Sequence, residues 1–127
     1  MRFAKIVFRI AGIWGVLVIT PLFFLFNVIS SQDPPAITHP GFYYGFVGCA
    51  LAWQIAFLVI ATDPVRFRPL ILPAIIEKVT YAIAIPILYS QHRVHVADVA
   101  LSGIDATFAL LFLTAFLRTK PPQPENV

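Results

Sequence analysis

Four places in the long apolar stretches of this chain carry side chains that could do chemistry. They are Gln54, the adjacent pair Glu77 and Lys78, Asp98, and Asp105. Burying a polar or ionisable group in a membrane segment is costly, so each is a functional candidate by default. Carboxylates near an ammonium group can form an ion pair, bind a ligand or relay a proton.

Helical spacing groups further polar residues with these. Glu77 and Tyr81 share one helix face, and Asp98, Ser102 and Asp105 share a face of the following segment. If the two faces meet, they form a polar seam inside the protein. With an aromatic wall beside Gln54, the expected polar seam comprises Trp53, Gln54, Glu77, Lys78, Tyr81, Asp98, Ser102 and Asp105.

The depths of these groups in the membrane are similar. At about 1.5 Å per residue, Glu77 lies about 11 Å and Asp105 about 18 Å from the cytoplasmic end. A lysine side chain reaches about 6 Å, so a Lys78–Asp105 ion pair is geometrically possible. Three interpretations are open: structural glue between helices, a pocket for a ligand, quinone or lipid, and a proton or ion path.

Other chemical signatures are sparse. His39, His92 and His95 fall in the two expected outer loops and form a further candidate metal site, although no zinc-enzyme spacing occurs. The single cysteine, Cys49, excludes an internal disulfide and a Cys-x-x-Cys exchange centre. Neither a glycine-rich phosphate loop nor a Gly-x-Ser-x-Gly motif is present. We therefore expect no catalytic residues and no cofactor.

The composition indicates that a bilayer surrounds the elements that carry these residues. Of 127 residues, 59% are hydrophobic and only 12% are charged, and the mean hydropathy is +0.84. About 25% charged residues is usual for a soluble domain. The apolar runs predict an all-α, integral membrane four-helix bundle, with spans at about 8–29, 42–61, 70–89 and 96–117.

Breaker residues separate the spans. Two prolines end the first at Ser30–Pro35, Asp63–Pro64 ends the second, and a polar stretch precedes the fourth. Residues 1–118 are expected to form one domain, and the proline-rich residues 119–127 a disordered tail. Cleavage of the first span as a signal peptide is an alternative, but its apolar run is longer than the usual 7–15 residues.

The basic residues predict the orientation. With both termini in the cytoplasm, seven basic residues lie on that side and only Arg93 lies outside, which matches the positive-inside rule. The basic residues form no stripe, so no nucleic-acid partner is expected. Membrane lipids, and a membrane protein or a second copy of the chain, are the expected partners.

Small residues predict where helices approach closely. Gly41, Gly45, Gly48 and Ala52 form a stripe on the second span, which we expect to be a packing face. Gly12 and Gly15 form a shorter stripe of small residues on the first span, which predicts a weaker packing face.

The layout resembles the DoxX-like group of small four-helix bacterial membrane proteins over about residues 6–118. The likeness rests on the length, the outer loop after span one, Tyr44–Gly45 opening span two, and the short turn from Asp63 to Arg68. It implies a multi-pass protein of the bacterial inner membrane, and it assigns no functional residue. We expect a non-catalytic accessory or ligand-binding module. Alternatives are a quinone- or redox-linked accessory or enzyme, and a subunit of an ion-coupled transporter.

Overall fold

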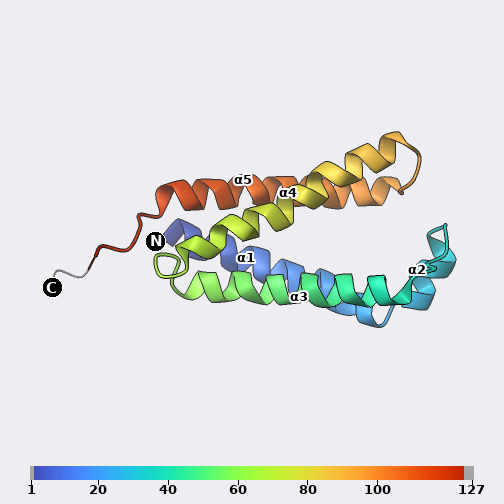
Figure 1. Cartoon of the computed structure of the whole chain (residues 1–127), viewed down its shortest axis with the longest axis horizontal. Coiled ribbons are helices and arrows are strands. Elements are labelled where there is room, and N and C mark those ends of the chain that lie inside the picture. The colour runs from blue at the N-terminus through green and yellow to red at the C-terminus, as the bar shows by residue number, and fades with distance from the viewer. Residues whose placement is uncertain (1, 125–127) are drawn as a thin grey trace.

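The computed structural model describes residues 2–124, in which long helices lie along one another (Figure 1). In chain order they are α1 (Arg2–Ile19), the short 3-10 helix η1 (Thr20–Phe23), α2 (Phe26–Gln32), α3 (Pro40–Thr62), α4 (Arg68–Ser90) and α5 (Val96–Arg118). No strand occurs within the described residues. By length and composition, α1 with η1, α3, α4 and α5 can each cross a membrane. The predicted all-α, four-helix membrane architecture is confirmed.

The first span differs from the predicted range 8–29. Helix α1 begins at Arg2, and the candidate span is Arg2–Phe23. The α-helix changes to η1 at Thr20, next to Pro21, which has no N–H to donate to the preceding turn. After a turn, α2 continues to Gln32, so part of the expected loop is helical.

The end of the first span is held by aromatic residues at the start of α3. The Tyr43 hydroxyl donates a hydrogen bond of 2.6 Å to the carbonyl oxygen of Leu22 in η1. The ring of Phe26 packs edge-on against Tyr43 and stacks on Tyr44 at 5.6 Å. These contacts satisfy a carbonyl that the broken helix leaves free.

The helices form two pairs. Helix α1 packs along α3, and α4 packs along α5, while contacts between the pairs are fewer. Figure 1 shows the pairs closest together near the N-terminus and separating toward the end that carries α2. The end where the two pairs are close is the closed end of the bundle. The buried core lies there and consists of Ala4, Val7, Phe8, Ala11, Phe57, Ile60, Ala61, Ile71, Ala74, Phe112 and Ala115.

Aromatic rings join the two pairs in this core. Phe8 of α1 stacks on Phe112 of α5 at 4.3 Å between centroids, and Phe57 of α3 meets Phe112 edge-on at 5.0 Å. Such ring pairs stabilise beyond the area that they bury. Three helices therefore converge on Phe112.

Glycine packing is the reverse of the expectation. A Cβ added to Gly41, Gly45 or Gly48 of α3 would meet nothing within 4 Å, so this stripe is not a packing face within the chain. Gly12 and Gly15 of α1 are buried and form the close crossing, against α3. The spacing of small residues indicates a face but does not say which neighbour covers it.

The closed end also holds a cap on α5. Arg68 of α4 donates hydrogen bonds to the carbonyl oxygens of Thr119, at 2.7 Å, and Phe116, at 3.3 Å. Its guanidinium lies 3.8 Å from the Phe116 ring centroid. A cation that binds the last carbonyls of a helix stabilises its C-terminus.

The first residue of the predicted tail packs against the bundle. Thr119 is 1% exposed, because the cap of α5 draws it against the bundle. Residues 120–124 have no regular secondary structure, and positions 125–127 of the predicted tail lie outside the described residues.

Replacing Arg68 by alanine is expected to lower the free energy of unfolding by about 1–2 kcal/mol, because two helix carbonyls lose a charged donor. Arg66→Ala is the matched control, since it removes the same charge from the same turn but Arg66 is exposed. Unfolding in mixed micelles measures both. Equal losses in the two variants would show that only loop charge matters.

Candidate functional site

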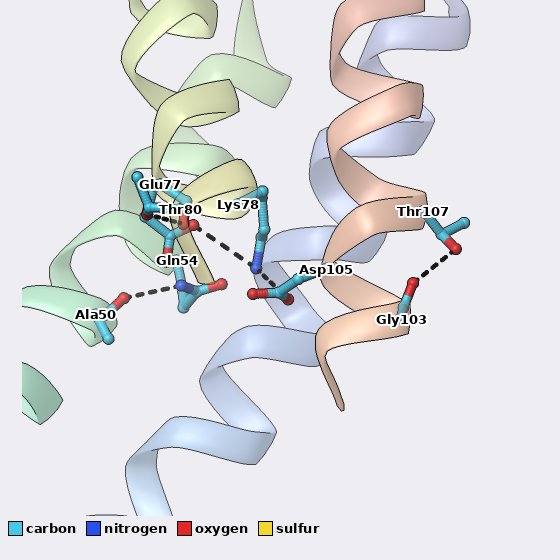
Figure 2. A network of polar contacts seen from close by, with 8 residues as sticks. All are labelled: Ala50, Gln54, Glu77, Lys78, Thr80, Gly103, Asp105 and Thr107. Carbon is cyan, nitrogen blue, oxygen red and sulfur yellow. Dashed lines mark hydrogen bonds and ion pairs between the residues drawn. The ribbon is translucent and has the colours of Figure 1, made fainter. Parts of the chain in front are cut away.

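A cluster of polar side chains lies next to the buried core, between three helices. Gln54 of α3, Glu77 and Lys78 of α4, and Asp105 of α5 form this polar cluster (Figure 2). Lys78 is at its centre: its Nζ lies 3.1 Å from Asp105 Oδ1 and 3.7 Å from Glu77 Oε2. The shorter contact is a charge-assisted hydrogen bond, and it joins α4 to α5.

Lys78 is held on its other sides by aromatic rings. The side chain is only 5% exposed, and its Nζ lies 5.4 Å from the Phe57 ring and 5.7 Å from the Phe108 ring. These distances are within the range of cation–π attraction. The ammonium group is thus held by contacts to α3 and α5 as well as to its own helix.

Gln54 is buried at the crossing of α1 and α3. Its Nε2 donates to the carbonyl oxygen of Ala50 at 2.9 Å, one turn earlier in α3. Its side-chain oxygen occupies the space where Gly15 would carry a Cβ. The absence of a side chain at Gly15 is therefore what lets a glutamine fit here.

Two acceptor atoms in the cluster have no hydrogen-bond partner. They are Gln54 Oε1 and Glu77 Oε2, and both are buried. Figure 2 shows the Gln54 and Glu77 side chains on the α3 side of Lys78, with Asp105 on the other side. The cluster therefore has a paired half, Lys78 with Asp105, and a half whose acceptors are not satisfied.

The other residues of the expected seam lie around or outside the cluster. Trp53 packs against the core beside Phe57, at 6.4 Å between ring centroids. Half-buried Tyr81 lies near Asp98 and Asp105. Ser102 is buried.

Ser102 and Asp98 have local roles. The Ser102 hydroxyl donates to the carbonyl oxygen of Val99 at 2.8 Å, within α5, so it needs no partner from another helix. Asp98 lies in the first turn of α5, where a negative charge interacts favourably with the helix dipole and stabilises the helix. The three residues of the polar stripe expected on α5 therefore have different roles. Of Asp98, Ser102 and Asp105, only Asp105 belongs to the polar cluster.

The three histidines do not assemble into a metal site. Within residues 2–124, no group of three or more His, Cys, Asp or Glu side chains is placed to hold a metal ion. His95 instead caps α5, its Nδ1 accepting a hydrogen bond of 3.1 Å from the Ala97 N–H. His39 lies at the start of α3 against Phe42, at 5.3 Å between ring centroids.

Two surface hollows lie away from the polar cluster. One is lined by α1, η1 and the turn after it, including Val16 and Phe24. The other lies between the two loops at the α2 end, with Asp33 and Arg93 in its walls. Neither has a residue of the polar cluster in its lining, so neither supplies an approach to Lys78.

Sequence reasoning missed two aromatic residues beside the cluster, Phe57 and Phe108, and it named Gly15 only as a packing position, not as the space that Gln54 occupies. Phenylalanines on membrane helices are too common to single out these two. Their signal is positional, since Phe57 lies three residues after Gln54, and Phe108 lies three after Asp105. The depth argument, by contrast, placed Lys78 and Asp105 within reach of each other.

Compared with protein-family models, curated proteins and solved structures, the chain matches none of them. The site is therefore interpreted from its own geometry.

Proposed function

We propose that this chain is a non-catalytic accessory module of a bacterial inner membrane, in which the Lys78–Asp105 pair clamps α4 to α5. The observation that carries the proposal is the 3.1 Å contact between a lysine that is almost fully buried and a carboxylate on the next helix. Because lipid tails are as apolar as leucine, such polar bonds and close packing must hold membrane helices together.

A clamp also accounts for the arrangement better than a reaction centre does. The charged atoms of the pair are used by each other, and aromatic rings surround the ammonium group. The described hollows lie elsewhere, so the pocket for a quinone or other redox partner has less support. The resemblance to DoxX-like proteins supports the bacterial placement and the four-span layout.

The test is complementation by a neutral pair. A deletion strain carrying the double variant Lys78→Met with Asp105→Leu should grow in competition as wild type does, because a pair of apolar side chains can replace a buried ion pair. The single variants should be outcompeted. A double variant that is folded but as unfit as the deletion would show that the charges themselves do the work, which contradicts a clamp.

The orientation is a separate prediction. The N-terminus, the turn between α3 and α4, and the C-terminal end of α5 lie at one end of the bundle (Figure 1). The basic residues Arg2, Lys5, Arg9, Arg66 and Arg118 are exposed there, against Arg93 at the other end. We expect this end to face the cytoplasm.

Reporter fusions check the orientation. Alkaline phosphatase, which is active only outside the cytoplasm, should be active when fused after Gln91 and inactive when fused to the C-terminus. The opposite pattern would place the basic end outside. Activity at both sites would mean that α5 does not cross the membrane.

A further inference from the structure

The charges of the polar cluster do not balance. It contains two carboxyl groups, Glu77 and Asp105, but one ammonium group, Lys78. The sequence has no other lysine, arginine or histidine within residues 42–61, 70–89 or 96–117. With every group ionised, the cluster would carry one net negative charge inside the membrane, and an uncompensated charge there is strongly disfavoured.

The hydrogen bonds are incomplete at the same place. Gln54 Oε1 and Glu77 Oε2 are buried acceptors without a donor, and Gln54 is 2% exposed. The two side chains lie beside each other in the cluster. An amide oxygen and an ionised carboxylate can only accept, so a single added hydrogen between them would satisfy both. A bound proton supplies that hydrogen and also removes the net negative charge of the cluster.

We propose that Glu77 holds a proton, so that the polar cluster is a neutral, proton-binding site within the membrane. The acid O–H of Glu77 donates to Gln54 Oε1, while Lys78 and Asp105 form the ion pair. Distance assigns the proton to Glu77, since Lys78 Nζ is 3.1 Å from Asp105 and 3.7 Å from Glu77. This inference does not depend on the accessory role, because the clamp uses Asp105 and not Glu77.

The groups that surround Glu77 are consistent with one exchangeable proton. Helix α3 presents Gln54, α4 presents Lys78 and Tyr81, and α5 presents Asp105, with Asp98 two turns away. Helix α1 contributes Gly15, which carries no charge. Among these groups, only Lys78 carries a positive charge that can pair with a carboxylate, and it already pairs with Asp105.

The test is infrared spectroscopy of the full chain in lipid nanodiscs at neutral pH. A protonated carboxyl group has a carbonyl stretch that is separate from carboxylate bands and moves on exchange into D2O. Wild type should show this band and Glu77→Gln should lack it. Asp98→Asn is the matched control and should keep it. Asp105→Asn should also lose the band, because Lys78 then pairs with Glu77 and the proton leaves.

The wild-type spectrum alone can overturn the proposal. If it shows no protonated carboxyl band, Glu77 is ionised and its charge is met in another way. A band that persists in Glu77→Gln would place the proton elsewhere. Glu77→Gln should also unfold at the same denaturant concentration as wild type, because glutamine mimics the neutral acid and keeps the ion pair. A marked loss of stability in this variant would count against a protonated Glu77.

Discussion

Lys78→Met is expected to lower the free energy of unfolding by about 3 kcal/mol or more. Methionine keeps most of the apolar stem but removes the ammonium group, which leaves Asp105 without its partner at 3.1 Å. The lysine is buried and contacts α3 and α5, so water cannot replace it at little cost. We rank this as the largest single effect in the protein.

A double-mutant cycle measures how much of this loss belongs to the pair. Lys78→Met, Asp105→Asn and their combination are unfolded reversibly in mixed micelles. The double variant should lose less than the two single variants together, by a coupling energy of about 1–2 kcal/mol. Additive losses would mean that the two residues act separately, and the clamp would then be abandoned.

Gly12→Ala and Gly15→Ala should produce the second-largest effect, about 1–3 kcal/mol each. A Cβ at Gly12 would come within 2.9 Å of the Gln54 carbonyl oxygen and 2.6 Å of the Leu58 side chain. A backbone oxygen cannot move without parting the helices. At Gly15 the Cβ would overlap the Gln54 side chain, which then loses its bond to Ala50.

Gly45→Ala is the matched control for these variants. A Cβ there meets nothing within 4 Å, and alanine favours helix more than glycine does, so no loss is expected. The same micelle unfolding experiment applies to all three variants. Destabilisation by Gly45→Ala as large as that by Gly12→Ala would mean that the α3 stripe is covered by something outside the chain, such as a second copy.

These predictions concern different parts of one arrangement. The lysine variant tests the bond between α4 and α5, and the glycine variants test the crossing of α1 and α3. Glu77 lies beside Gln54 where the two helix pairs meet, so Glu77→Gln reports on the junction. A protein that tolerated Lys78→Met, Gly12→Ala and Gly15→Ala would have its helices held by lipid or partners rather than by its own contacts.

The amino-acid sequence by itself determined the architecture of this protein. Long apolar runs, broken at Pro34–Pro35 and Pro64, must become helices in a bilayer, since each backbone polar group needs a partner within its own segment. Spacing and depth were also enough to bring Lys78 within reach of Asp105. These are local properties, or properties of one helix in an apolar solvent.

Only the tertiary structure decided which helix faces meet. The glycine stripe of α3 has the stronger pattern, yet Gly12 and Gly15 of α1 are the residues in close contact. Ser102 shares the stripe of Asp105 but bonds within its own helix. Facing partners depend on how helices rotate and tilt against each other, which is a balance over every contact in the bundle and is encoded in no single segment.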